Sequence, residues 1–309
     1  MKKLLKWGAA ITAMAGVITS AVIYTVFSDV KEAADEMYVP IDEQLITSRK
    51  SEVIVTTKEP FSALILGVDE REGDRGRSDT LIVLTVNPTL QTTKLLSIPR
   101  DSYVEIYNKN IEDKINHAYA FGGIELSVQT VEQLLQIPID YVTKINMEGF
   151  VDLIDIIGNI PVHNAFEFYY EGEYYPEGEL LLNGERALKY VRMRYDDPQG
   201  DFGRQNRQKE IIKGVLQKGI SFRSTLRYAD ILSTLKENVE MNLTIDTISS
   251  VQKNYASSFK TIEQLHFVEG VGKKMDGIYY YLLNEQELTQ IQTDLQRHLQ
   301  LQHTSSPDD

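Results

Sequence analysis

FSALILGV at residues 61–68 and TLIVLTV at residues 80–86 are the stretches of sequence that decide the fold class. Both are almost continuously apolar, which is typical of strands that are covered by other elements on both faces. A third strand, TKLLSI, is predicted at residues 93–98. Between the first two strands lies a loop of glycine and charged residues at 69–79. We therefore predict a buried sheet with charged loops at the ends of its strands.

Helical patterns alternate with strands along the rest of the chain. Helices are predicted over residues 114–121, 125–135, 149–157, 184–190, 204–218, 225–238, 245–255 and 285–299, and strands over 141–145 and 262–268. Gly158 is expected to end one helix, and Gly203 and Gly219 to bracket another. This alternation indicates an α/β fold, a three-layer α/β/α domain with a central mixed sheet. In such sheets ligands bind at loops beyond the strand ends.

Composition excludes several classes of protein. Among 309 residues, 45 Asp and Glu stand against 32 Lys and Arg, giving a net charge of −13. A duplex-binding protein usually carries a basic excess, so non-specific nucleic-acid binding is not expected. The chain has no cysteine, which excludes disulfides, thiolate metal sites and cysteine nucleophiles.

The N-terminus predicts a membrane anchor. Lys2, Lys3 and Lys6 precede residues 7–27, a stretch of twenty-one residues without a charge. As a helix it would be roughly 30 Å long, about the thickness of a hydrocarbon core. The positive flank is expected to stay in the cytoplasm, so the bulk of the chain would lie outside the cell. A cleaved signal peptide is the main alternative, since signal cores are usually shorter, and a buried core helix is the other.

We accordingly divide the chain into five parts. These are a cytoplasmic N-terminus (1–6), a transmembrane signal anchor (7–27), an extracellular stalk (28–60), a catalytic domain (61–301) and a flexible tail (302–309). The stalk is expected from its polar, charge-rich sequence with little periodicity.

Arginine and aspartate gather at the predicted strand ends. They lie in the segments LGVDER (66–71), RSDT (77–80), IPRD (98–101), YVRMR (190–194) and GRQNRQ (203–208). If residues 190–195 are extended, Arg192 and Arg194 point to one side and Val191 and Met193 to the other. On the helix that follows, Arg204, Arg207 and Gln208 share one face by their spacing. Gly203 at the start of that helix would let an anion approach the backbone N–H groups.

These residue types suit phosphate binding. The guanidinium fork of arginine binds phosphate oxygens in pairs and stays charged. Two carboxylates beside several arginines suggest a divalent cation held between aspartate and phosphate, with the oxygen ligands that Mg²⁺ prefers. The alternative is that Asp and Arg pair as structural salt bridges. The concentration of arginines in an acidic protein favours an anion site.

Other features leave two interpretations open. His117 is a packing residue or a wall of the cleft, with packing favoured. The apolar side chains of residues 150–157 line a lipid tunnel or form core, and core is favoured. The tyrosine-rich stretch 168–175 predicts a hairpin, although tyrosine faces also suit sugar contacts. His298 and His303 are the one close pair of histidines, at the end of the chain that we expect to fray.

The ordered set of motifs resembles the LytR-CpsA-Psr family. It consists of LGVDER, RSDT, IPRD, KINHAYAFGG (114–123), YVRMRYDDPQGDFGRQNRQ (190–208) and the N-terminal anchor, and it covers residues 61–219 well. The resemblance is strongest to compact members that attach wall teichoic acid in Gram-positive bacteria. It implies an α/β/α domain with an apolar tunnel for a polyprenyl chain and a charged mouth for its pyrophosphate.

Roles of single residues follow from this resemblance. Asp69 and Asp79 would hold Mg²⁺. The pyrophosphate would be bound by Arg100, Arg192, Arg194, Arg204 and Gln208. Arg77, Asp101 and Arg207 are secondary candidates for orienting these groups. Asp201 would accept the proton of the incoming hydroxyl, and Asp79, Arg100 and Asp201 together form the predicted catalytic set.

The resemblance also implies a reaction. The enzyme would be a polyisoprenyl-teichoic acid–peptidoglycan teichoic acid transferase, which moves an anionic glycopolymer from a polyprenyl-pyrophosphate carrier to peptidoglycan at the membrane. No serine elbow is present, so direct displacement is preferred to a covalent enzyme intermediate. Two alternatives remain: a hydrolase of lipid pyrophosphates, and a non-catalytic regulator that binds polyprenyl phosphate. A DNA-binding regulator is disfavoured by the outward topology and the net charge of −13.

Overall fold

The computed structural model describes residues 32, 34–40, 53–70, 76–221 and 234–301. The predicted anchor at 7–27, the tail at 302–309 and most of the helix predicted at 225–238 lie outside these residues. Within them, no helix is both long and apolar enough to span a bilayer.

A six-stranded mixed sheet forms the centre of the domain, as predicted. Its strands are β1 (Phe61–Val68), β2 (Ser78–Asn87), β3 (Thr92–Ser97), β6 (Tyr141–Asn146), β11 (Val239–Met241) and β12 (Ile262–Leu265). They lie in the order β11-β6-β1-β2-β3-β12. The pairs β1/β6 and β3/β12 are parallel, and the other three pairs are antiparallel.

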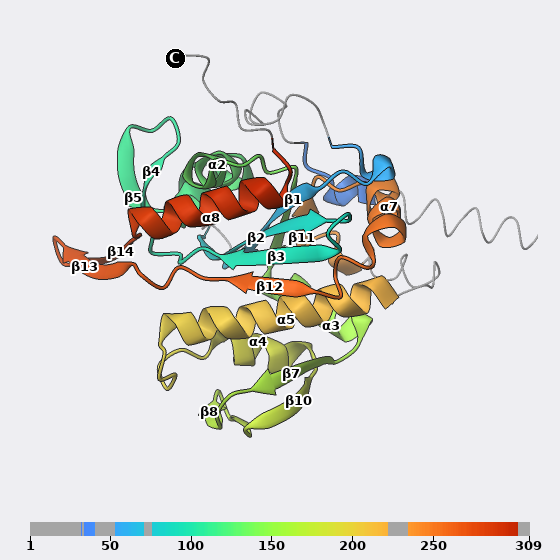
Figure 1. Ribbon diagram of the computed structural model, residues 1–309. Helices are drawn as coiled ribbons and strands as arrows, with labels where there is room; N and C mark the ends of the chain where they lie inside the picture. Colours follow the sequence, from blue (N-terminus) through green and yellow to red (C-terminus); the bar gives the residue numbers. More distant parts are fainter. Residues whose placement is uncertain (1–31, 33, 41–52, 71–75, 222–233, 302–309) are drawn as a thin grey trace, which may run out of the picture.

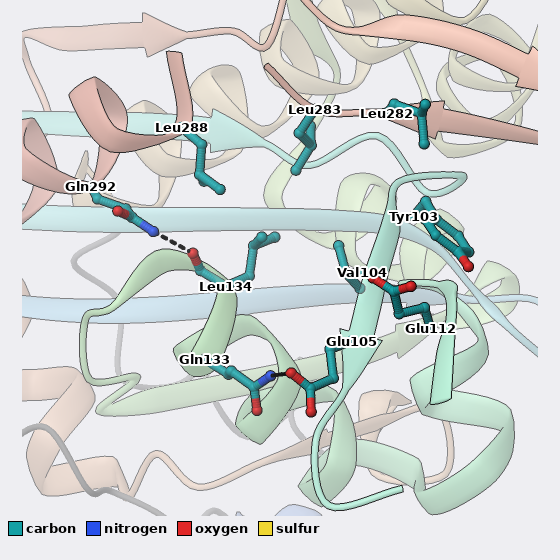
Figure 2. A pocket seen from close by; sticks show the side chains of 10 residues that line it. All are labelled: Tyr103, Val104, Glu105, Glu112, Gln133, Leu134, Leu282, Leu283, Leu288 and Gln292. Carbon is teal, nitrogen blue, oxygen red and sulfur yellow. Dashed lines mark hydrogen bonds between the residues drawn. The ribbon is translucent and has the colours of Figure 1, made fainter. Parts of the chain in front are cut away.

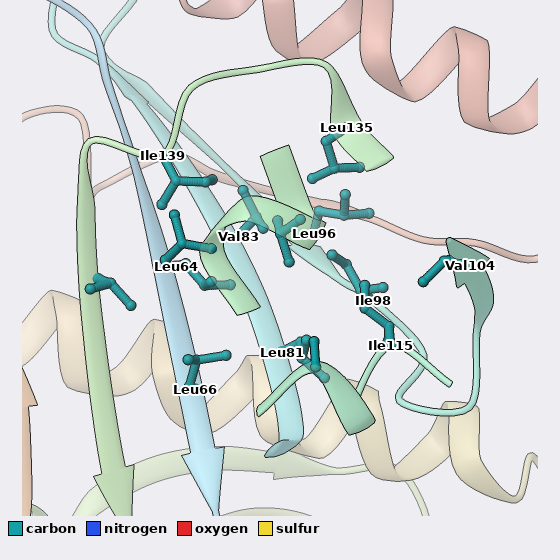
Figure 3. Packing of buried hydrophobic residues seen from close by; sticks show 14 of the residues in the cluster. Leu64, Leu66, Leu81, Val83, Leu96, Ile98, Val104, Ile115, Leu135 and Ile139 are labelled. Carbon is teal, nitrogen blue, oxygen red and sulfur yellow. The ribbon is translucent and has the colours of Figure 1, made fainter. Parts of the chain in front are cut away.

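Helices cover both faces of this sheet (Figure 1). On one face lie α2 (His117–Leu135) and α8 (Glu285–His298), and on the other lies α5 (Asp201–Ser221). Because side chains alternate along a strand, Leu64 and Leu66 of β1 join the apolar cluster under α2 and α8, whereas Ile65 packs with Ile212 of α5 on the opposite face. Figure 3 shows the larger of these two layers. The α/β/α arrangement of the domain follows from this division.

A smaller group of elements packs beneath α5 (Figure 1). It contains α3 (Met147–Ile157), α4 (Gly184–Arg192), β7 (Ile160–Asn164) paired with β10 (Gly178–Leu182), and the hairpin of β8 (Phe168–Tyr170) and β9 (Glu173–Tyr175). Ile154 of α3 and Ile211 of α5 belong to one buried cluster here, which agrees with a core role for the predicted helix at 149–157. The tyrosine-rich stretch is the predicted hairpin.

Two further hairpins and a helix lie at the edges of the domain. The hairpins are β4 (Tyr103–Ile106) with β5 (Ile111–Lys114), and β13 (Val271–Met275) with β14 (Ile278–Leu282). The helix is α7 (Ile245–Tyr255), which lies against the short 3₁₀ turn η2 (Val55–Thr57). Neither hairpin was predicted, because short exposed strands carry little hydrophobic periodicity.

A cavity of about 360 Å³ lies between α2, α8, β4 and the end of β14 (Figure 2). Its walls include Val104, Leu134 and Leu288, and the side chain of Gln292 donates a hydrogen bond to the carbonyl of Leu134 at 2.8 Å. None of the predicted site residues lines it.

The structure corrects several boundaries. Residues 117–135 form one helix that is interrupted at Gly123, where φ is 68°, and Lys114 lies in a strand. Gly203 and Gly219 lie inside α5 and do not bracket it. Part of the predicted stalk belongs to the domain, because Ala34 and Met37 are buried against Leu235 and Met241.

His298 is also placed differently from the expectation of a frayed end. It is buried, and its ring nitrogens lie 2.8 Å from the hydroxyl of Thr85 and 2.9 Å from that of Thr92. Burial, together with the nearby Lys94, lowers the pKa of this imidazole to about 4. His298 therefore attaches the C-terminal end of α8 to strands β2 and β3 as a neutral side chain.

Replacing Glu132 by glutamine should flatten the dependence of stability on pH. Burial raises the pKa of this carboxyl to about 8, even though it accepts a hydrogen bond from the amide of Ile139. Because the folded state holds the proton more tightly than the unfolded state, stability falls as the pH rises towards the folded pKa, by at most about 1.4 kcal/mol per pH unit. Glutamine keeps the acceptor oxygen without the charge. Urea unfolding at about pH 6 and about pH 9 measures the free energy of unfolding of the wild type and of the variant. An equal change between the two pH values in both proteins would contradict the raised pKa of Glu132.

Candidate functional site

The ends of three strands meet at one edge of the sheet. Antiparallel pairing places the end of β1 and the end of β3 beside the start of β2, since Val68 pairs with Ser78 and Ser97 pairs with Ile82. The register of β1 and β2 shifts between Gly67 and Val68, which leaves Asp79 without a partner in the ladder. Such bulges redirect side chains at sheet edges. This edge therefore gathers Asp69, Asp79 and Arg100, as predicted.

The charged groups at this edge are paired. A guanidinium nitrogen of Arg100 lies 2.8 Å from the carboxylate of Asp79, and its Nε lies 3.8 Å from Asp101. Asp101 also pairs with Lys114 at 2.7 Å. Burial opposes the charge on Arg100, but Asp79, Asp201 and Asp101 outweigh this effect, so the pKa of Arg100 is raised. Arg100 is therefore a fixed cation.

The first turns of α5 complete the cluster. Arg204 lies 2.7 Å from Asp201 one turn earlier in the helix. The amide of Gln208 donates a hydrogen bond to the hydroxyl of Thr80 at 2.9 Å, which joins α5 to the strand that carries Asp79. Five predicted residues, namely Asp79, Arg100, Asp201, Arg204 and Gln208, thus come together from three parts of the chain.

Arg204 is the most unusual member of this cluster. Its side chain is buried, and its Nε has no hydrogen-bond partner among the described residues. Burial lowers the pKa of Arg204, and the nearby cations Arg100 and Arg194 lower it further against the opposing effect of Asp201 and Asp79. A buried, crowded guanidinium with an unused donor is costly unless an anion binds to it. The arrangement therefore suits a phosphate or pyrophosphate group.

The loop between β1 and β2 is closed by a tight backbone contact. The amide of Asp69 donates to the carbonyl of Arg77 at 3.3 Å. Gly76 has φ of 71°, and a Cβ atom there would lie 2.1 Å from the carbonyl oxygen of Asp69. Only glycine fits this position. The contact holds the backbone of Asp69 near the start of β2, while the side chain of Arg77 is exposed.

Arg207 does not belong with Arg204 and Gln208. Its guanidinium donates to the carboxylate of Asp197 and to the carbonyls of Met193 and Tyr190, the last at 2.9 Å. It also lies 5.5 Å from the ring centre of Phe168. The prediction that all three side chains share one face is wrong, because Arg207 is turned into the apolar cluster beneath α5. It holds the turn between α4 and α5.

Gly203 serves the same turn and not an incoming anion. A Cβ atom at this position would lie 1.9 Å from a carboxylate oxygen of Asp197. The space that the missing side chain leaves is therefore filled by Asp197 of the same chain. The predicted approach of an anion to the backbone at Gly203 is not available.

Arg192 and Arg194 are separated by the end of a helix. The segment 190–195 is not extended throughout, since α4 continues to Arg192. Arg192 is exposed and lies 4.0 Å from Glu171 in the β8–β9 hairpin. Arg194, by contrast, influences the pKa of Arg204 and that of Tyr279. Val191 and Met193 are both buried, as predicted.

The two arginines should consequently respond differently to substitution. We expect Arg194→Ala to slow the reaction at this site about tenfold or more, because a charge-assisted contact to phosphate is lost. Arg192→Ala should change the rate by less than about threefold, since an exposed ion pair contributes little. Initial rates of both variants at one substrate concentration test this. An equal loss in both variants would contradict the separation seen in the structure.

Two residues near the cluster were not predicted. Lys114 pairs with Asp101, and the phenol of Tyr279 lies close enough to Asp101, Asp201 and Arg194 for these charges to influence its pKa. Lys114 begins the motif KINHAYAFGG but was assigned to a helix and given no role, and Tyr279 lies about seventy residues beyond the last motif. No spacing in the sequence connects Tyr279 to the cluster.

Comparisons with known proteins identify the family to which the chain is similar. The model of the LytR_cpsA_psr family matches residues 24–297. One similar protein is the polyisoprenyl-teichoic acid–peptidoglycan teichoic acid transferase TagU of Bacillus subtilis strain 168. It is 46% identical over 262 residues, which are 84% of this chain and 85% of the relative.

Solved structures are similar as well. The crystal structure of B. subtilis TagU has a TM-score of 0.65 at 44% identity, over 78% of this chain and 97% of that one. The structure of TagT bound to LIIa-WTA has a TM-score of 0.73 at 32% identity, over 85% of this chain and 99% of the other.

Proposed function

This chain belongs to the LytR-CpsA-Psr family, and on that basis we propose that it is a wall glycopolymer transferase, a polyisoprenyl-teichoic acid–peptidoglycan teichoic acid transferase. Its relatives of 41–46% identity are named for this activity. A structural relative is bound to a WTA ligand, which supports an anionic wall polymer, in particular wall teichoic acid, as the group transferred.

The donor is proposed to be a polyprenyl pyrophosphate. The observation that carries this proposal is the position of the partly buried Arg100 and the buried Arg204 at the end of an apolar layer. Val68, Leu81 and Ile98 belong to the large apolar cluster, and each lies one or two positions from Asp69, Asp79 or Arg100. A lipid pyrophosphate has the same division into an apolar chain and a doubly charged end. Arg100, Arg194, Arg204 and Gln208 are proposed to bind the charged end.

The reaction is proposed to be a direct displacement at phosphorus. The acceptor hydroxyl of peptidoglycan forms a new P–O bond at the phosphorus next to the polymer. The bond from this phosphorus to the bridging oxygen breaks, and the lipid leaves as its monophosphate. Asp201 is proposed to take the proton of the hydroxyl, and Arg100 and Arg204 stabilise the negative charge that develops on the leaving phosphate.

Mg²⁺ is proposed as the cofactor of this site. Among the described residues, no group of three or more His, Asp or Glu side chains could hold a metal ion. Mg²⁺ often uses only one or two protein carboxylates together with substrate phosphates and water, so Asp69 and Asp79 suit it as a pair. When bound, the ion would supply charge neutralisation on the phosphates.

We also propose that residues 7–27 anchor the protein in the cell membrane, with the catalytic domain outside. A lipid-linked donor and a wall acceptor both lie on that side. Retention of residues 7–27 in the mature protein, read from its N-terminal peptide, would support the anchor, and a mature N-terminus beyond residue 27 would refute it.

Product analysis tests the proposed reaction. The full chain is incubated with a polyprenyl-pyrophosphate-linked glycopolymer, uncross-linked glycan strands and Mg²⁺. Transfer predicts lipid monophosphate and a polymer joined to the glycan through a phosphate, and excess chelator or Asp79→Ala should abolish both products. Release of polymer phosphate at the same rate without glycan strands would indicate the hydrolase instead. Binding of the donor without turnover would indicate the regulator.

A further inference from the structure

The β13–β14 hairpin is anchored beside the charged cluster. Its buried residue Tyr281 donates a backbone hydrogen bond to the carbonyl of Asp101 at 2.8 Å. The ring of Tyr281 also packs edge-on against Phe202 at the start of α5, with 5.7 Å between ring centres. The base of the hairpin is thus fixed to the two segments that carry Asp101 and Asp201. In Figure 1 the rest of the hairpin extends outward from this end of the sheet.

One face of the hairpin is turned towards the cluster. Lys274 pairs with Tyr279 across the two strands, and Gly272 pairs with Tyr281, so these four residues share a face. Tyr281 on this face contacts Phe202, next to Asp201, so Tyr279 on the same face is turned towards this end of α5. In agreement, burial, Asp101 and Asp201 raise the pKa of the Tyr279 phenol and Arg194 lowers it. The ring is nevertheless 45% exposed. Tyr279 therefore combines proximity to the site with an open surface.

Gly272 lies beneath the side chain of Tyr279 and leaves room for its ring. A Cβ atom at Gly272 would lie 2.7 Å from the phenol oxygen and 2.8 Å from a ring carbon of Tyr279. The aromatic ring consequently lies over bare backbone. A partly exposed ring of this kind presents a flat apolar surface with one polar group, which suits the C–H face and hydroxyls of a sugar.

The hairpin also carries unpaired positive charge in an acidic protein. Lys273 and Lys274 are exposed, and neither forms an ion pair with another described residue. The net charge of the chain is −13, whereas residues 271–282, with Lys273, Lys274 and Asp276, carry a net positive charge. Lys274 lies on the face that also carries Tyr279, and Lys273 lies on the opposite face. The stem peptides of peptidoglycan carry free carboxylates, and lysine is complementary to them.

We propose that Tyr279 and Lys274 form a binding surface for the acceptor glycan strand, with the sugar against Tyr279 and a carboxylate near Lys274. The inference rests on the proposed function. It assigns the acceptor to the side of the cluster that faces the β13–β14 hairpin, where the proton-accepting Asp201 lies between the bound strand and the phosphate.

Kinetics with variable acceptor test the inference. The full chain is assayed with saturating polyprenyl-pyrophosphate-linked polymer and increasing glycan strands. Tyr279→Ala should raise the acceptor KM about tenfold, with kcat changed by less than about twofold, because ground-state and transition-state binding are lost equally. Tyr279→Phe, which keeps the ring, should resemble the wild type. Lys274→Glu should raise KM about fivefold or more, since the carboxylate then meets a like charge.

Tyr174→Ala is the matched control. Tyr174 is 40% exposed, lies in the β8–β9 hairpin and stacks on Tyr169 with 4.6 Å between ring centres. Its loss should leave KM and kcat unchanged. Co-sedimentation with purified peptidoglycan gives a second readout that does not depend on turnover, and Tyr279→Ala should reduce the bound fraction while Tyr174→Ala should not. The Tm of each variant confirms that the fold is intact.

The outcomes separate this inference from the proposed function. If the wild type neither transfers polymer nor binds geranyl pyrophosphate, the proposed function fails. If the wild type transfers polymer but Tyr279→Ala and Lys274→Glu behave like Tyr174→Ala, only the acceptor surface is refuted. If both hairpin variants instead lose binding to phosphatidylglycerol vesicles at an unchanged acceptor KM, the hairpin contacts the membrane and the inference is likewise overturned.

Discussion

Arg204→Ala is expected to reduce polymer transfer by about a hundredfold, the upper end of the range for one charge-assisted contact of roughly 1.5–3 kcal/mol. Arg204 is buried between Asp201 and the cations Arg100 and Arg194, with its Nε donor unused. Binding of a pyrophosphate would supply the missing acceptor and relieve the crowding of positive charge. Loss of the guanidinium removes this stabilisation from both the bound donor and the leaving phosphate. Initial rates of transfer at saturating acceptor measure the effect.

Two variants make the result specific. Arg204→Lys keeps the positive charge but not the planar fork, and it should recover only part of the rate. Arg192→Ala removes an exposed arginine from the same region and should leave the rate within about threefold of the wild type. Removal of Arg204 should not unfold the domain, because it removes the repulsion between this guanidinium and the neighbouring cations Arg100 and Arg194. Transfer by Arg204→Ala at the wild-type rate would refute the assignment of this residue to the donor.

Arg207→Ala is expected to cost about 3–5 kcal/mol in the free energy of unfolding, the largest effect on stability that we predict. The side chain of Asp197 is 1% exposed and that of Arg207 is 6% exposed, and the two form an ion pair. Without Arg207, the carboxylate of Asp197 stays buried without its cation, and the carbonyls of Met193 and Tyr190 lose their donors. Urea unfolding measures the loss.

A double-mutant cycle identifies the cause. The variant Asp197→Ala/Arg207→Ala should be more stable than Arg207→Ala alone, because no buried charge is then left unpaired. If the double variant is as unstable as the sum of the two single variants, the ion pair is not the source of the effect. Arg204→Ala, the same substitution three residues earlier in α5, should instead impair transfer and leave the fold intact.

Buried charge therefore has two uses in this domain. Around Arg207, each of the three guanidinium nitrogens has an oxygen partner within the chain, so the group stabilises the turn between α4 and α5. Arg204 has Asp201 as its ion-pair partner, but its Nε donor has no partner among the described residues and Arg100 and Arg194 lie nearby, so a bound anion would complete the site. Between these two arginines, the unused donor of Arg204, and not burial by itself, marks the difference.

Several features of this protein were determined by the sequence alone. The predicted bounds of the strand at 61–68 and of the helix at 245–255 agree with the structure. The strand is a nearly continuous apolar run, and the helix has a helical pattern of apolar residues. The ordered set of motifs, among them RSDT, IPRD and GRQNRQ, together with the N-terminal anchor, identified the family. They also placed Asp79, Arg100 and Arg204 at the ends of elements, where the structure brings them together.

Only the tertiary structure decided what each charged residue touches. Arg204 and Arg207 are both buried and stand three residues apart in one helix, yet their partners lie on different elements. Tyr279 reaches the cluster from a hairpin that no motif marks. Periodicity depends on neighbours along the chain, whereas burial, pairing and pKa depend on groups that packing brings close from distant positions. The sequence could therefore indicate an anion site. Which arginines bind the ligand and which stabilise the fold could be assigned only from the packed domain.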